Sequence, residues 1–199
     1  MFPNTILPDG QIIVKQVIPD LSILDSAIVH HHDGMYDDPN QKARVDWVVK
    51  SASGERVLEI GTATGYVISR ITAKYRVGID NDIARLLLAK MRYPDIEFYY
   101  ANILNLAPFK DQFDCLILTE VLEHLPFDNI HYALIHCLLT APRLVVTVPH
   151  GNNVMTNPEH LWLPSLGLMQ NFIGGTMLAH ITAVEYVGDF IMMIIERNR

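Results

Sequence analysis

Short apolar segments alternate with longer amphipathic or Ala- and Leu-rich segments along most of the chain. The apolar segments are rich in Val, Ile and Leu and too short for helices, which is typical of strands buried on both faces. Strands are expected at residues 56–60, 75–79, 96–100, 114–118 and 143–148. Helices are expected at about 45–51, 66–73, 82–91, 128–139 and 163–173, with Asn40 and Asp128 as caps. This alternation predicts a parallel sheet covered by helices on both faces.

The last segment has a different pattern. Residues 178–196 predict two strands that turn at Gly188-Asp189, and a turn this tight joins antiparallel strands. The predicted fold class is therefore α/β: a doubly wound sheet of seven strands, mostly parallel, with an antiparallel C-terminal pair.

The N-terminal segment lacks this alternation. Its turn-forming residues include Pro3, Pro8, Gly10, Pro19 and Gly34. Residues 1–40 are therefore predicted to be an irregular arm or lid, and residues 41–199 a single α/β domain.

Composition and charge restrict the class of protein. Of the 199 residues, 50% are hydrophobic and 19% are charged, which excludes a mainly disordered chain. The net charge of −7 disfavours nucleic acid as a partner, since phosphate-binding surfaces usually need a basic excess. The longest strongly apolar run, residues 190–195, is far too short to span a bilayer, and no secretory signal is visible. We expect a cytoplasmic protein without membrane contact, with Cys115 and Cys137 in its core.

The first expected strand leads into a glycine-containing turn. Residues 57–65 read VLEIGTATG, and the second strand ends in VGID at residues 77–80. Ligands of doubly wound sheets bind outside the carboxyl ends of the strands, where a carboxylate can accept both hydroxyls of a ribose. The dinucleotide fingerprint G-x-G-x-x-G would fall on Gly61, Ala63 and Tyr66, so two of its three glycines are missing. The motif therefore fits an NAD site badly.

The order and spacing of these motifs resemble the class I S-adenosylmethionine-dependent methyltransferase family. The resemblance also rests on Asn102 after the third strand, Phe113-Asp114 before the fourth, and TEVLEHLP at residues 119–126. Two positions depart from the family pattern, because Ala63 replaces the middle glycine of the turn and Asn102 replaces the usual Asp. The resemblance implies a Rossmann-like fold, S-adenosylmethionine as cofactor and S-adenosylhomocysteine as product.

By this resemblance, the methionine part of the cofactor would lie against the turn after the first strand. Gly61, Thr62 and Gly65 would line it, and Glu59 would organise the turn or reach the cofactor amine through water. Thr119 would close the site from the end of the fourth strand.

The same resemblance assigns the adenosine part to the next two strand ends. Asp80 would hold the ribose hydroxyls, with Asn81 beside the adenine. Asn102 and Ile103 would bracket the adenine, and the Asn102 amide oxygen can accept a hydrogen bond from its amino group.

Glu120, Glu123 and His124 would share one face if residues 120–125 formed a helical turn. His124, or a carboxylate such as Glu123, can act as a general base on the acceptor. Alternatively, the three side chains hold a divalent cation, with His150 or His160 as a further ligand. This E-x-x-E-H pattern is similar to that of small-RNA 3′-end ribose methyltransferases and some quinone-pathway O-methyltransferases, where metal assistance is known. In the third interpretation the carboxylates only cap backbone amides and shape the pocket. A metal is left open here and is not favoured.

Two features of the arm carry alternative interpretations. The consecutive histidines at residues 30–32 cannot all face one point in a strand or helix, which favours a polar loop over a metal site. Tyr36 resembles the aromatic residue of lid segments in the family, or it only packs.

The sequence predicts a methyltransferase that acts on an oxygen or nitrogen of a small metabolite by in-line methyl transfer. One alternative is a metal-assisted ribose 2′-O-methyltransferase acting on an RNA end. Another is a non-catalytic, cofactor-binding partner subunit, since fold does not guarantee function. The sequence does not specify the acceptor or the oligomeric state.

Overall fold

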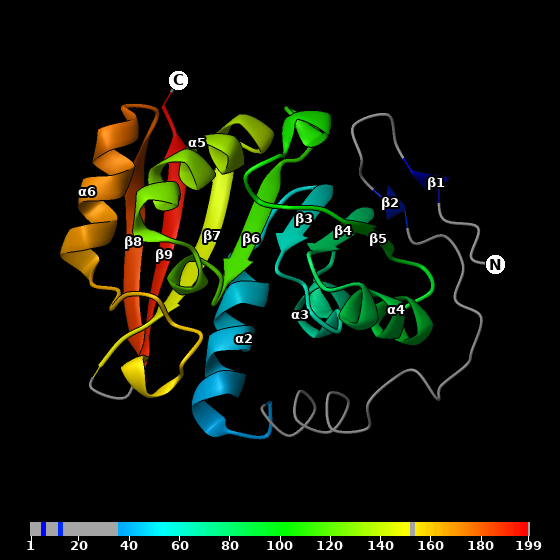
Figure 1. Cartoon of the computed structure of the whole chain (residues 1–199), viewed down its shortest axis with the longest axis horizontal. Helices are drawn as coiled ribbons and strands as arrows, with labels where there is room; N and C mark the ends of the chain where they lie inside the picture. The colour runs from blue at the N-terminus through cyan, green and yellow to red at the C-terminus, as the bar shows by residue number, and fades with distance from the viewer. Residues whose placement is uncertain (1–4, 7–11, 14–35, 152–153, 199) are drawn as a thin grey trace.

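The computed structural model describes residues 5–6, 12–13, 36–151 and 154–198. The strands are β1 (Thr5–Ile6), β2 (Ile12–Ile13), β3 (Arg56–Ile60), β4 (Tyr75–Asp80), β5 (Glu97–Tyr100), β6 (Cys115–Thr119), β7 (Arg143–Pro149), β8 (Ala179–Val187) and β9 (Phe190–Arg197). They form one sheet in the order β1-β2-β5-β4-β3-β6-β7-β9-β8 (Figure 1). The seven predicted strands are β3 to β9. The neighbours β5-β4-β3-β6-β7 are parallel, and the pairs β7–β9 and β9–β8 are antiparallel. The predicted Rossmann-like, doubly wound fold is confirmed.

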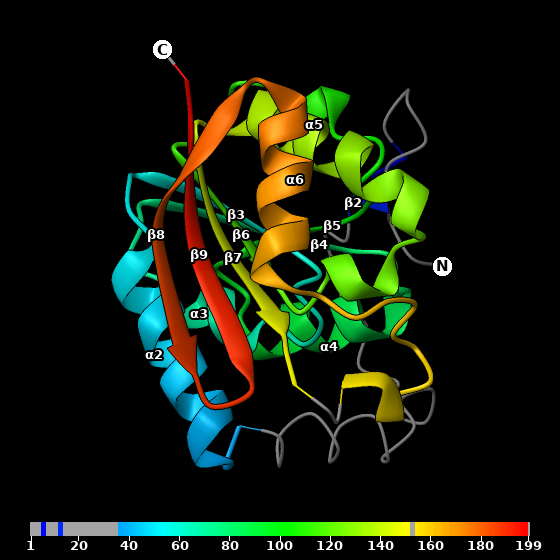
Figure 2. The same ribbon diagram turned by 90° about the vertical axis from the view of Figure 1, so that its left-hand side faces the viewer.

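Helices cover both faces of the sheet, as expected (Figure 2). The α-helices are α2 (Pro39–Ser51), α3 (Tyr66–Arg70), α4 (Ile83–Arg92), α5 (Ile130–Thr140) and α6 (Leu166–Thr176). Short 3₁₀ helices are η2 (Ala107–Phe109), η3 (Leu122–His124), η4 (Phe127–Asn129) and η5 (Val154–Thr156). One apolar cluster packs α2, α3 and α4 against the sheet, and a second packs α5 and α6 against the other face.

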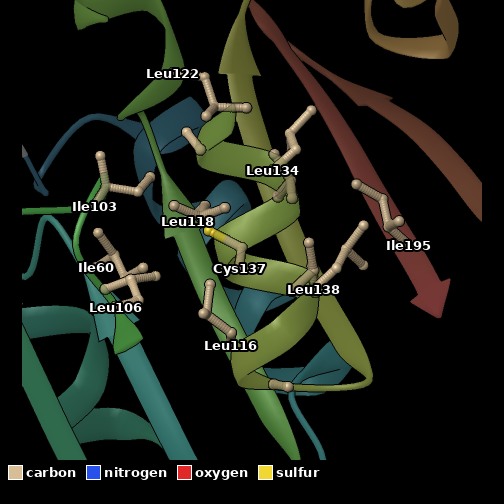
Figure 3. Packing of buried hydrophobic residues seen from close by; sticks show 14 of the residues in the cluster. Ile60, Ile103, Leu106, Leu116, Leu118, Leu122, Leu134, Cys137, Leu138 and Ile195 are labelled. Carbon is tan, nitrogen blue, oxygen red and sulfur yellow. The ribbon is translucent and has the colours of Figure 1, made fainter. Parts of the chain in front are cut away.

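The core follows the period-2 alternation of the strands. Leu116 and Leu118 of β6 pack toward α5, while Cys115 and Ile117 of the same strand belong to the opposite cluster. In Figure 3, Cys137 of α5 lies among the leucines that face this strand. Both cysteines are buried and free, so their predicted place in the core is confirmed.

Helix ends are where the sequence prediction was wrong. Asp38, not Asn40, caps α2, because its carboxylate accepts the N–H groups of Asn40 and Gln41 while Pro39 takes the first helical position. Helix α5 begins at Ile130, after the separate turn η4, instead of at Asp128. Helix α3 ends at Arg70, three residues before the expected end at residue 73.

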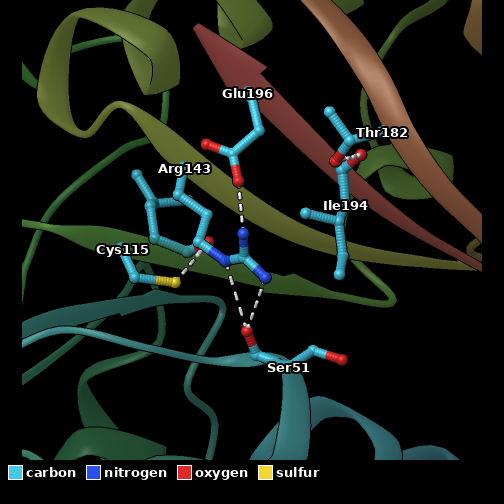
Figure 4. Close-up of polar contacts among 7 residues, drawn as sticks. Ser51, Cys115, Arg143, Thr182, Ile194 and Glu196 are labelled. Atoms are coloured by element: carbon cyan, nitrogen blue, oxygen red, sulfur yellow. Dashed lines mark hydrogen bonds and ion pairs between the residues drawn. The ribbon is translucent and has the colours of Figure 1, made fainter.

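Arg143 at the start of β7 joins three parts of the fold (Figure 4). Its guanidinium donates to the Ser51 carbonyl at the end of α2, at 3.1 and 3.3 Å, and forms an ion pair with Glu196 of β9. The helix that precedes the first parallel strand is thereby fastened to the last strand.

Most of the predicted N-terminal arm lies outside the described residues, as do the histidines at 30–32. Within the arm, β1 pairs with β2, and β2 pairs antiparallel with β5, so the sheet is extended by two short strands. The role of residues 1–40 as a lid stays a prediction. Within the described residues, no helix combines the length and apolarity that a membrane span requires.

Candidate functional site

Two cavities open at the carboxyl ends of β3, β4, β5 and β6, where the strand order reverses around β3. Their volumes are about 450 and 590 Å³. They adjoin, because they share the lining residues Gly61, Arg85, Glu120, His124 and Glu159. We refer to them as the first cavity, beside β4 and β5, and the second cavity, beside α2 and β7. All of the predicted site residues line one or both, except Gly65 and Glu123.

The turn after β3 has a left-handed backbone at three positions. Gly61 has φ +70°, Ala63 φ +46° and Gly65 φ +80°. A Cβ on Gly61 would lie 2.5 Å from Cγ2 of Val121, so the glycine allows close packing against the loop after β6. Ala63 adopts a left-handed conformation that glycine, which has no Cβ, adopts at lower cost, in agreement with the glycine of the family pattern at this position. Gly65 packs under Phe98 and lines neither cavity.

Glu59 holds this turn from inside the sheet. Its carboxylate accepts from the Thr62 hydroxyl at 2.7 Å and from the Ile68 N–H of α3 at 3.1 Å. Burial raises the pKa of Glu59 to about 8, against the opposing effect of these two hydrogen bonds. Glu59 thus joins the turn to the start of α3, and its predicted role toward the cofactor stays a prediction.

Asp80 ends β4 at the floor of the first cavity. Its two carboxylate oxygens accept from the N–H groups of Ala63 and Asp82, at 2.8 and 2.9 Å. Each oxygen keeps a further lone pair for a ligand hydroxyl. Burial raises the pKa of Asp80, partly offset by the two backbone hydrogen bonds. Asn81 is exposed beside it and lines the same cavity.

The opposite wall of the first cavity follows β5. Asn102 is exposed, and its amide oxygen accepts from the Leu104 N–H at 2.9 Å. Ile103 is buried and supplies an apolar surface. Thr119, at the end of β6, lines the second cavity. Flat apolar and hydrogen-bonding surfaces of this kind suit a heterocyclic base.

The segment after β6 is not the helical turn that the sequence predicts. Glu120 has φ +55°, and the 3₁₀ helix η3 begins only at Leu122. Glu120 accepts from the Thr147 hydroxyl at 2.8 Å, and burial raises its pKa to about 7. Glu123 is fully buried, and its pKa is raised well above the usual range by burial and by the nearby Glu120. Glu123 therefore lies beneath the cavity wall instead of on it.

His124 lines both cavities and lies edge-on to His160, with ring centroids 5.0 Å apart. Burial lowers the pKa of His124, which favours the neutral imidazole that a general base requires. Two hydrogen bonds fix the loop carrying His160 to η3. The Leu161 N–H donates to the Glu123 carbonyl at 2.9 Å, and the Trp162 indole N–H donates to the Leu122 carbonyl at 3.0 Å.

Sequence reasoning missed Arg44, a cation of α2 that lines the second cavity with only 2% of its surface exposed. Its guanidinium donates to Gln41 at 3.0 Å and to the Thr147 hydroxyl at 3.4 Å. Arg44 shares the buried face of α2 with Val45 and Val48. The helical spacing from Arg44 to Val48 was therefore the sequence feature that could have indicated its burial.

Tyr36 also lines the second cavity, and its ring stacks on Tyr66 of α3 at 3.9 Å. Burial raises its pKa to about 12. The stacking shows that Tyr36 packs against α3. Because Tyr36 also lines the second cavity, its role as part of a lid over the cofactor stays a prediction.

Residues 57–139 match the family model of a methyltransferase domain. The N-methyltransferase NodS from Bradyrhizobium japonicum WM9, solved with S-adenosyl-L-homocysteine, is 17% identical with a TM-score of 0.73, over 89% of this chain and 98% of that chain. A chain from the complex that contains the Haloferax volcanii Trm112 methyltransferase activator is 12% identical with a TM-score of 0.72, over 89% and 98%. The small RNA methyltransferase HEN1 is 15% identical with a TM-score of 0.66, over 81% of this chain and 26% of that chain. No curated protein sequence matches this chain.

Proposed function

We propose that this chain, which has the domain of class I S-adenosylmethionine-dependent methyltransferases, transfers a methyl group to an oxygen or nitrogen of a small molecule. The observation that carries the proposal is the pair of adjoining cavities at the switch point, with Gly61 lining both and Asp80 lining the first. The names of the similar structures include an N-methyltransferase and a small RNA methyltransferase, so they do not indicate one acceptor for this chain. The class of acceptor is therefore inferred from the residues that line the second cavity.

The first cavity suits the adenosine part of the cofactor. In this proposal the free lone pairs of Asp80 accept the two ribose hydroxyls, and Asn81 lies beside the base. Asn102 and Ile103 hold the adenine from the other side. The backbone bonds of Asp80 keep its carboxylate in place before the ligand arrives, which lowers the entropic cost of binding.

The second cavity suits the methionine part and the acceptor. Gly61 and Thr62 allow the chain of the cofactor to approach the turn, while Gly65 contributes through packing. Arg44 offers a buried cation to the cofactor carboxylate, a strong charge-assisted contact. Glu59, on the same cavity, lies where it can meet the amine.

Methyl transfer is an in-line displacement at carbon. The bond from the methyl carbon to sulfur breaks as a bond to the acceptor oxygen or nitrogen forms, and the acceptor loses a proton. His124, at the junction of both cavities, is the proposed acceptor of that proton, with Glu123 supporting it from below. Most of the rate enhancement then comes from alignment of the two reactants and exclusion of water.

The far end of the second cavity indicates a small polar acceptor. Its lining includes His150, Asn157, His160 and Asp189, with Phe190 as an apolar wall. The net charge of −7 argues against a long nucleic acid. A non-catalytic partner subunit remains the competing function, and a screen of acceptors with labelled donor separates the two.

Calorimetry with S-adenosylhomocysteine tests the cofactor site directly. We expect one bound molecule per chain, and we expect Asp80→Ala to weaken binding by about 1–3 kcal/mol through the lost charged hydrogen bonds. Asp95→Ala, an exposed aspartate outside both cavities, is the matched control. Folded protein that binds NAD and not S-adenosylhomocysteine would contradict the proposal.

A further inference from the structure

Two side chains line both cavities at their junction and face a methyl acceptor there, Glu120 and His124. Thr147 fixes Glu120 in place, because the Glu120 N–H donates to the Thr147 carbonyl at 3.1 Å and the carboxylate accepts from the Thr147 hydroxyl at 2.8 Å. Among the described residues, no other group donates to this carboxylate. Its second oxygen is therefore left for a ligand at the junction.

His124 presents a second atom that accepts hydrogen bonds. Its Nδ1 lies 3.1 Å from the Glu159 carbonyl. A carbonyl only accepts, so the neutral ring carries its proton on Nδ1 and a lone pair on Nε2. Burial lowers the pKa of His124, which favours the neutral ring. The junction thus offers a carboxylate oxygen and an imidazole nitrogen, and neither atom donates a hydrogen bond.

Two accepting groups discriminate between methyl acceptors by the number of hydrogens that each acceptor carries. A hydroxyl has one hydrogen and can donate to only one of the two groups. A primary ammonium ion has three hydrogens and can donate to both groups through charge-assisted hydrogen bonds. An accepting group that loses its water without gaining a donor is costly, so the junction favours the ammonium ion over a hydroxyl.

The charges around the second cavity also favour a cation. Three carboxylates line it in addition to Glu59, which is assigned to the cofactor: Glu120, Glu159 and Asp189. The two arginines of the lining are engaged elsewhere, since Arg44 is assigned to the cofactor carboxylate and Arg85 pairs with Asp82 at 3.3 Å. A cationic methyl acceptor is therefore attracted to this cavity, whereas an anionic one is repelled.

We propose that the methyl acceptor is a primary amine, which Glu120 binds as the ammonium ion at the junction of the cavities. This inference rests on the proposed function and narrows its acceptor to nitrogen. Glu120 then determines the class of acceptor, and Thr147 positions Glu120. Burial raises the pKa of Glu120 to about 7, and a cation beside the carboxylate lowers it again, so the two charges stabilise each other.

The bonds and protons of the step balance with these two groups. The ammonium ion loses one proton to Nε2 of His124, which leaves the amine nitrogen with a lone pair. This lone pair forms the bond to the methyl carbon as the carbon–sulfur bond breaks, and the electrons of the broken bond stay on the sulfur of S-adenosylhomocysteine. Positive charge develops on the nitrogen, where the Glu120 carboxylate stabilises it. The product leaves as a methylated ammonium ion.

The test uses the full-length chain saturated with S-adenosylhomocysteine and titrated with methylammonium chloride, while NMR follows the ring signals of His124. We expect a saturable shift with methylammonium and none with methanol or sodium acetate. Glu120→Gln keeps the shape and removes the charge, and should weaken methylammonium binding at least about tenfold, the effect of one lost charge-assisted hydrogen bond. Glu55→Gln changes an exposed glutamate outside both cavities and should bind methylammonium as the wild type does.

Two further measurements separate hydrogen bonding from charge and positioning from folding. Tetramethylammonium chloride carries the charge without an N–H group and should bind more weakly than methylammonium. Thr147→Val removes the hydroxyl that positions Glu120 and should weaken methylammonium binding while S-adenosylhomocysteine binds as in the wild type. Equal binding of the two cations, or unchanged methylammonium affinity in Glu120→Gln and Thr147→Val, would overturn the role of Glu120.

The class of acceptor and the proposed function fail in different ways. Saturation by methanol or acetate, or no saturation by methylammonium, would overturn the amine as acceptor. Calorimetry with S-adenosylhomocysteine is carried out on the wild type and every variant, and intact binding in those cases keeps the proposed function. A folded wild-type chain that does not bind S-adenosylhomocysteine would contradict the proposed function itself.

Discussion

The two sides of the site differ in how their buried carboxylates are satisfied. On the side of β3 and β4, Glu59 and Asp80 accept two hydrogen bonds each, one from the turn after β3 and one from a neighbouring segment. On the side of β6, Glu120 accepts one and Glu123 accepts none among the described residues. The first side is organised by its own hydrogen bonds, whereas the second leaves one buried carboxylate without a partner among the described residues. The two sides of one site thus differ in how far their buried charges are compensated within the protein.

The strongest test of the side of β3 and β4 is Gly61→Val. A Cβ at position 61 would lie 2.5 Å from Cγ2 of Val121, so the valine side chain clashes there. A β-branched residue is also strained at φ +70°. We expect S-adenosylhomocysteine binding to be abolished in calorimetry. Gly174→Val, where a Cβ would meet nothing within 4 Å, is the control and should bind normally. Normal binding by Gly61→Val would show that the turn does not shape the cofactor site.

Matched substitutions of two buried carboxylates should move stability in opposite directions. Glu59→Met leaves the Thr62 hydroxyl and the Ile68 N–H without their acceptor and should lower the free energy of unfolding by about 1–3 kcal/mol. Glu123→Met replaces an unpartnered carboxylate with an apolar side chain and should raise it by about 1–3 kcal/mol. Urea unfolding measures both changes. Destabilisation of equal size in both variants would remove the contrast between the two sides.

A further effect is expected in the pH dependence of stability. The pKa of Glu59 rises from 4.5 to about 8 on folding, so the unfolded chain loses this proton at lower pH than the folded chain. The stability contributed by the protonated group is complete below about pH 4.5 and is lost as pH rises toward 8. Glu59→Gln keeps the shape and removes the titration. The fall in unfolding free energy between pH 5 and pH 8 should therefore be smaller in the variant, and parallel curves would contradict this.

The sheet was predictable because burial on both faces makes each parallel strand a continuous apolar run. The position of Asp80 followed from the same logic, since it ends such a run. The segment after β6 was not predictable, because Glu120 adopts a left-handed conformation that glutamate has no preference for. The contact between η3 and the loop carrying His160 joins residues about 40 positions apart, which local periodicity does not report.

The place of β9 in the sheet has a consequence for how the chain is made. This strand comes last in sequence but lies between β7 and β8, and Arg143 connects it to the end of α2. Until residues 190–197 leave the ribosome, β7 has an open edge and β8 lacks the neighbour with which it pairs. Open edges of this kind invite pairing with other chains. The nascent protein is therefore prone to aggregation until this strand has emerged, and a product truncated before residue 190 would keep that open edge.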